Sequence, residues 1–112
     1  MAYSDYLVER VRQRLLGAGE IEEKKMMGGL LFMVNGKMCI GVDKDKGNGQ
    51  DRLMVRVGKL NYEQLLQKKG SNKMDFTGRP MKGFLFLSPE AFDAESDLDF
   101  WVKKALEFNA ML

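Results

Sequence analysis

Two apolar segments joined by Asn35-Gly36 constrain the fold of this chain more than any other feature. The segments cover residues 30–34 and 37–42 and leave only those two residues between them. Asn-Gly at such a position is typical of a type I′ hairpin, because both central residues of that turn need a positive φ. The chain is therefore expected to form an antiparallel hairpin here, as part of a larger sheet.

The two-residue turn also fixes which residues of the hairpin lie opposite each other. The expected pairs are Val34–Lys37, Met33–Met38 and Phe32–Cys39. Because side chains alternate along a strand, this register assigns each residue to a face of the sheet. One face is expected to hold Leu31, Met33, Met38, Ile40 and Val42, and the other Leu30, Phe32 and Cys39.

Helical periodicity and capping residues predict three helices in the rest of the chain. Their ranges, each with its N-cap, are 5–16 (Ser4), 62–69 (Asn61) and 97–110 (Ser96). Further strands are expected at 52–57, 74–76 and 84–88, while residues 21–26 form an extended stretch and Ser88-Pro89 starts a single helical turn. The order is helix, three strands, helix, two strands, helix. This order predicts a two-layer α+β domain with a mostly antiparallel sheet and helices on one face.

The expected sheet has apolar side chains on both faces, since the hairpin and residues 84–87 are apolar on either side. Helices in a two-layer fold cover only one face. The other face is then a partly apolar surface, which usually marks a partner site or a dimer interface. The nine methionines of the chain favour either adaptable packing or a soft binding surface. The alternative is that one helix crosses behind the sheet.

Length and composition indicate one globular domain, residues 1–112. The hydrophobic fraction of 45% is ample for a packed core. No apolar run approaches the ~20 residues that span a bilayer, and the N-terminus lacks the order of a signal peptide. The only cysteine, Cys39, can form no internal disulfide, which fits a reducing compartment. We therefore expect a cytoplasmic protein without a membrane partner.

The chain contains no histidine. This removes the usual general base near neutral pH and the commonest transition-metal ligand. One cysteine cannot supply a structural zinc site, which needs four ligands. Cys39 itself lies mid-strand between apolar residues, where a thiol is buried and unreactive. The sequence thus predicts a protein that is not an enzyme and has no catalytic residue, metal site or cofactor.

Charge is unevenly distributed although the net charge is only +2. Residues 52–82 carry eight basic residues against two acidic ones, and residues 90–99 carry five acidic residues and no basic one. Such polarity can steer an anionic partner or pair two copies head to tail. The alternative is a solvated surface with acidic residues placed at the start of a helix.

Two glycine-containing basic segments, 24–29 and 75–84, stand out. In the second, Arg79 and Lys82, together with Arg56, can donate to a phosphate or an acidic partner. The first would add Lys24 and Lys25 if the strands bring both segments together. The residues expected to shape the backbone are Gly28, Gly29, Asn35, Gly36, Gly78, Pro80 and Gly83. Direct DNA reading is disfavoured, because no helix-turn-helix, zinc finger or basic-region zipper is present.

Five segments together resemble the N-terminal domain of the TfoX/Sxy family, the regulators of natural competence in bacteria. They are residues 23–29, 32–38, 54–58, 75–84 and 101–106. The chain is identified as a stand-alone copy of that domain. The resemblance implies an α+β fold and a transcription-related role, which in the competence regulators involves working with the cyclic-AMP receptor protein at certain promoters. It supplies no catalytic residue.

The residues and the resemblance together predict a non-enzymatic regulatory module that binds proteins, linked to transcription or competence. Its expected partners are the transcription machinery or a regulator of the cyclic-AMP receptor type, and a second copy of the chain in a homodimer. The alternative is a small-anion or nucleic-acid binder that uses Arg56, Arg79 and Lys82.

Overall fold

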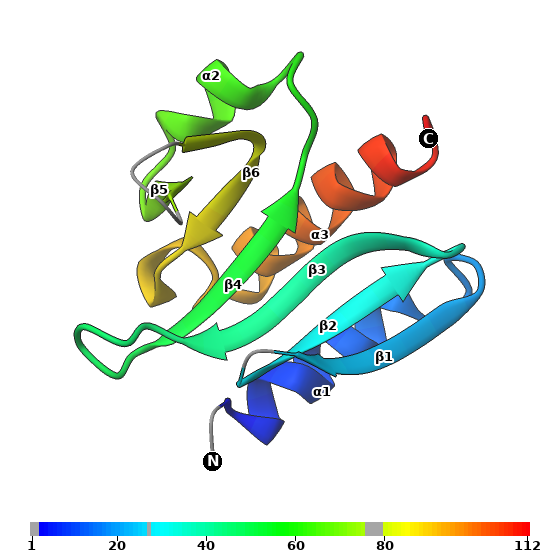
Figure 1. The fold of residues 1–112 in the computed structure, drawn as a ribbon, viewed down its shortest axis with the longest axis horizontal. Helices are drawn as coiled ribbons and strands as arrows, with labels where there is room; N and C mark the ends of the chain where they lie inside the picture. The colour runs from blue at the N-terminus through cyan, green and yellow to red at the C-terminus, as the bar shows by residue number, and fades with distance from the viewer. Residues whose placement is uncertain (1–2, 27, 76–79) are drawn as a thin grey trace.

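The computed structural model describes residues 3–26, 28–75 and 80–112, and within them an antiparallel sheet of six strands. The strands lie in the order β1-β2-β3-β4-β6-β5, with helices α1 and α3 behind the sheet in Figure 1. The predicted α+β class is confirmed. The elements are α1 (Asp5–Leu15), β1 (Ile21–Met26), β2 (Gly29–Val34), β3 (Lys37–Lys44), β4 (Asp51–Arg56), α2 (Tyr62–Leu66), β5 (Ser71–Asp75), β6 (Pro80–Leu87), the 3₁₀ turn η1 (Pro89–Ala91) and α3 (Glu95–Asn109).

The structure adds one strand to the predicted order. Residues 21–26, expected only to be extended, form β1 and pair with β2 from Ile21↔Val34 to Met26↔Gly29. The strand Ile21–Met26 is half-buried at its first residue and exposed at the others. Its sequence therefore lacks the apolar alternation by which strands are found. Charged side chains on such an edge strand discourage pairing with other chains.

The helix boundaries differ from the prediction by more than one residue at two places. The third helix begins at Glu95, so Ala94 and not Ser96 is the N-cap, and no side chain caps it. The second helix ends at Leu66, four residues before Gly70, and Asn61 makes no capping bond. The first helix agrees better, because the Leu7 backbone N–H donates to the Ser4 hydroxyl oxygen at 3.2 Å.

The main core lies between the helices and one face of the sheet. It joins apolar residues of all three helices to residues of β2, β3, β4 and β6. Leu7, Val11 and Leu15 form the buried stripe of α1, and Leu98 and Trp101 belong to that of α3. All described helices thus pack on the same face, as the sequence predicted.

The hairpin confirms the predicted turn but not the whole register. Asn35 and Gly36 have φ values of 53° and 80°, and Met33 pairs with Met38. Phe32, however, pairs with Ile40 and not with Cys39, because a β-bulge shifts the register. A bulge places two residues of one strand opposite one of its partner. Ile40 and Val42 therefore lie in the main core with Phe32, and their predicted assignment to the opposite face is wrong.

Candidate interaction face

The sheet face opposite the helices carries a second apolar cluster, here called the open face. Leu31, Met54 and Met74 are its buried members, with 8%, 7% and 5% of their surface exposed. Partly buried side chains surround them: Met33, Met38, Phe84 and Phe86. In the part of the chain that the structure describes, no helix contributes a residue to this cluster. Among the described residues, therefore, no helix covers this face, contrary to the alternative in which one helix crosses behind the sheet.

Two arginines of β4 lie against the aromatic rings of β6 on this face. The Arg52 guanidinium sits 3.7 Å from the centroid of Phe86 and binds both carboxylate oxygens of Asp43, at 2.9 and 2.7 Å. These hydrogen bonds raise the pKa of Arg52. Arg56 lies 5.3 Å from the Phe84 centroid, and its carbon Cζ also approaches the ring of Phe108. The rings of β6 are therefore partly capped by cations.

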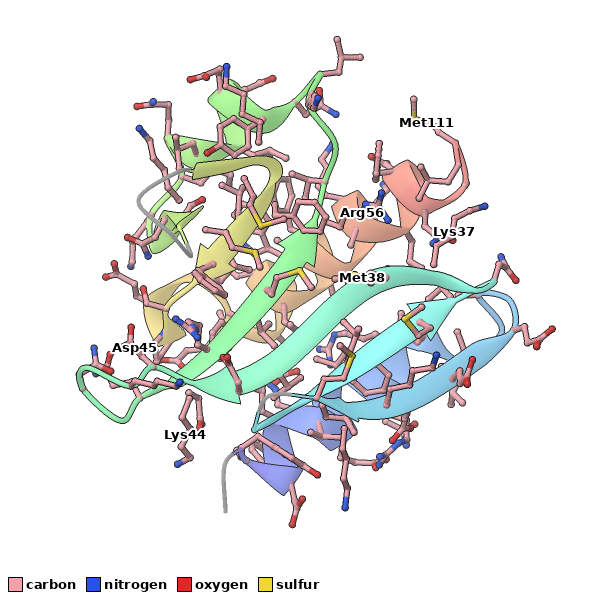
Figure 2. All side chains as sticks on the ribbon, in the orientation of Figure 1. Lys37, Met38, Lys44, Asp45, Arg56 and Met111 are labelled. Atoms are coloured by element: carbon pink, nitrogen blue, oxygen red, sulfur yellow. The ribbon has the colours of Figure 1, made fainter. Side chains whose placement is uncertain are left out.

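A shallow cavity of about 200 Å³ opens in the middle of the open face. Backbone at Gly29 and Gly41 borders it, and four methionines line it together with Leu31 and Phe86: Met26, Met38, Met54 and Met74. Figure 2 labels Met38 on the side of the sheet that faces the viewer. Flexible thioether side chains adapt to apolar groups of different shape. The cavity therefore suits an apolar side chain of a partner better than a polar ligand.

Gly29 shows why the chain needs a glycine pair before β2. A Cβ atom at this position would lie 2.8 Å from the Val42 carbonyl oxygen, a distance that real Cβ atoms avoid. The expected close backbone approach at residues 28–29 is thus present, and Gly28 adopts a φ of 80°. In the second segment, the Gly83 carbonyl accepts from the backbone N–H groups of Val57 and Gly58.

The structure places Lys24 and Lys25 on β1, away from Arg56 on β4, whereas Lys82 lies on β6, the strand next to β4. Lys24 pairs with Leu31 and shares the open face, whereas Lys25 pairs with Leu30 and points toward the opposite face. Arg56 lies on β4, three strands from Lys24, which corresponds to roughly 14 Å across the sheet. Lys82 is exposed on β6. Gly78 and Arg79 lie outside the described residues, as does the side chain of Pro80, and a shared basic patch stays a prediction.

The comparison with known families gives one result. The model of the TfoX N-terminal domain matches residues 13–109, which include every strand of the sheet, α2, α3 and the last turn of α1. The chain belongs to the TfoX N-terminal domain family. The predicted family is thereby confirmed. No curated protein matches the chain.

The acidic segment of this TfoX N-terminal domain is partly engaged with α1. Arg14 donates from Nε to the Asp99 carboxylate at 2.6 Å, and Arg10 lies 3.0 Å from the Glu95 carboxylate. Hydrogen bonds from Arg14, with a contribution from Arg10, lower the pKa of Glu95. Two of the five acidic residues at 90–99 thus join α1 to the start of α3. Charge counting along the sequence could not show this pairing.

The Asp43–Arg52 pair and the cavity were not predicted from the sequence. The ion pair could in principle have been predicted from the pairing of the two strands, because Asp43 and Arg52 lie directly opposite each other in the β3–β4 ladder. The cavity depends on Met26 and Met74, which come from the two edge strands. Nothing local in the sequence brings those methionines to one surface.

Among the described residues, no group of three Cys, Asp or Glu side chains is placed to hold a metal ion. Within the same residues, no helix combines the length and the apolar character needed to span a bilayer.

Cys39 lies in the main core with 1% of its surface exposed. Burial raises the pKa of its thiol to about 11. We therefore expect the folded domain at pH 8 to react with a disulfide reagent at least about a hundredfold more slowly than the urea-unfolded chain, because the thiolate is the reactive form. A colourimetric thiol assay with and without urea measures both rates. Equal rates would contradict the buried position of Cys39.

The same group makes stability depend on alkaline pH. The pKa of the thiol is about 8.5 in the unfolded chain, whereas burial raises the pKa to about 11 in the folded domain. Its contribution to stability is present below the lower value and is lost as the pH rises through the interval. Urea midpoints measured from pH 8 to pH 11 should fall more for the wild type than for Cys39→Ala.

Proposed function

We propose that this TfoX N-terminal domain is a non-enzymatic regulatory module that acts by binding proteins, in a role linked to transcription or competence regulation in the bacterial cytoplasm. Family membership supports the regulatory role. The observation that carries the binding role is the open face, a methionine-rich apolar surface that no described helix covers. Apolar patches of this kind on soluble domains usually meet a partner.

Two partners follow from this proposal. A second copy of the chain covers the open face in a homodimer, which removes the apolar cluster from water. The dimer then presents exposed basic side chains, among them Lys25 and Lys82, to a partner of the transcription machinery or a regulator of the cyclic-AMP receptor type. Charge steers such an encounter and sets its dependence on salt.

The regulator arm is tested by titrating the labelled domain with the purified cyclic-AMP receptor protein of the same bacterium, with cyclic AMP present. We expect saturable binding that weakens about tenfold for Lys82→Glu, since rim charges act on association. Lys103→Glu is the matched control, because Lys103 is an exposed lysine on α3, on the helical side of the molecule. Absence of binding at about 100 μM regulator would contradict this arm of the proposal.

The alternative, an anion or nucleic-acid site, rests on the guanidinium of Arg56, which has no ion-pair partner within the described ranges. The same labelled domain, titrated with duplex DNA, single-stranded RNA and inorganic phosphate over a range of salt, decides between the two. Affinities tighter than about 10⁻⁴ M at physiological salt, lost in Arg56→Gln, would favour the alternative.

A further inference from the structure

One row of side chains across the open face has opposite charges at its two ends. The ladder pairs Glu22 of β1 with Met33 of β2, and Met33 with Met38 of β3. Arg56 follows on β4, next to Val55, which pairs with Ile40. The row therefore reads acid, methionine, methionine, base across four adjacent strands, and Figure 2 shows Met38 and Arg56 on its β3 and β4 part.

Both charged ends lack an ion-pair partner in the part of the chain that the structure describes. Glu22 is exposed on the edge strand, and the Arg56 guanidinium contacts the rings of Phe84 and Phe108. The two charges lie about three strand spacings apart, roughly 14 Å, so they do not pair within one chain. Each is free to pair with an opposite charge on a molecule that covers the face.

We propose that two copies of the domain pack their open faces together about a two-fold axis that runs parallel to the strands, between β2 and β3. This rests on the homodimer of the proposed function and specifies its geometry. Such an axis reverses the order of the strands between the two copies. Glu22 of each copy then lies against Arg56 of the other, and Met33 lies against Met38. The contact is self-complementary, as a two-fold interface requires.

Charge complementarity favours this axis over two other placements, in which the axis runs along the row and across the strands. An axis along the row sets Glu22 against Glu22 and Arg56 against Arg56, and both contacts are repulsive. An axis between this row and the next pairs Glu22 with Lys24, because Lys24 lies two residues along β1. In that arrangement the second copy buries the guanidinium of Arg56, on the inner strand β4, without placing a carboxylate beside it. Burying an unpaired charge is costly, whereas Lys24 at the edge keeps its ammonium in water under the proposed axis.

The proposed axis also passes through the part of the open face whose apolar side chains are not covered by an arginine. Phe84 and Phe86 of β6 already stack against Arg56 and Arg52. Met33 and Met38 of β2 and β3 are only partly buried. The apolar side chains that gain most from a partner are thus those of β2 and β3.

The test is a charge exchange measured by sedimentation equilibrium on the full chain. The wild type is expected to dimerise. Glu22→Arg and Arg56→Glu should each raise the dissociation constant about tenfold or more, since each sets like charges together. The double variant Glu22→Arg/Arg56→Glu should return within about threefold of the wild type, because the exchanged charges meet again across the axis. Glu63→Arg, a charge reversal on α2 away from the open face, should leave dimerisation unchanged.

The outcomes separate this geometry from the homodimer itself. A wild type that stays monomeric at millimolar concentration overturns both. A dimer that Met38→Glu disrupts but neither charge variant weakens overturns the axis and keeps the open-face dimer. Rescue of Glu22→Arg by Lys24→Glu, and not by Arg56→Glu, also overturns the axis. Glu22 is exposed on an edge strand, so Glu22→Arg stays informative even if circular dichroism shows that Arg56→Glu is less well folded.

Discussion

Replacing Phe32 with alanine should lower the free energy of unfolding by about 3–5 kcal/mol, the usual cost of removing a buried ring. Phe32 has 0% of its surface exposed and lies in the main core between β2 and the helices. Its neighbour Met33 points to the open face and is only partly buried. Met33→Ala should therefore cost about 1 kcal/mol or less in the monomer. Urea unfolding at low protein concentration measures both values.

The pair of variants tests the assignment of the two faces. Phe32 and Met33 are adjacent in sequence and both are large and apolar, so neither composition nor local propensity explains a difference between them. Equal costs would mean that both faces are equally covered, and the open face would lose its role. At high protein concentration the two variants should differ in a second way. Met33→Ala should weaken self-association, whereas Phe32→Ala should act through the stability of the fold.

The fold was predictable from the sequence where a local rule decides it. The Asn35-Gly36 turn depends on the positive φ of two residues, and the structure confirms it. The stripe of α1 depends on helical periodicity, which is also local. The bulge in β3 has no such signal, and a shift of one residue turns every following side chain to the other face. Ile40 and Val42 were misplaced for this reason alone.

The site was predictable in outline only. Counting apolar faces was enough to anticipate an uncovered surface, because a two-layer fold has one face without helices. Placing charges on that surface needs the register of every strand. Lys24 and Lys25 illustrate this, since neighbours on a strand point to opposite faces and only Lys24 shares the open face. The row from Glu22 to Arg56 joins residues thirty-four positions apart, and only the strand order together with the register reveals it.

Replacing Gly58 with alanine should lower the free energy of unfolding by about 2–5 kcal/mol, and should also disturb the open face. Gly58 has a φ of +83°, a conformation that costs an L-residue about 1–2 kcal/mol. A Cβ atom there would also overlap the ring of Phe108, and such overpacking typically costs a further 1–3 kcal/mol, about the same again. Thermal and urea unfolding measure the loss.

A second substitution separates the two causes. Phe108→Ala removes the ring that the new Cβ atom meets, so Gly58→Ala/Phe108→Ala should be more stable than the sum of the single effects by about 1 kcal/mol or more. The cost of the positive φ remains. Because Phe108 is one of the two rings beside Arg56, Gly58→Ala should also displace that guanidinium and weaken dimerisation. Additive stabilities together with an unchanged dimer would show that Phe108 yields freely, and would break the link between this glycine and the charged row.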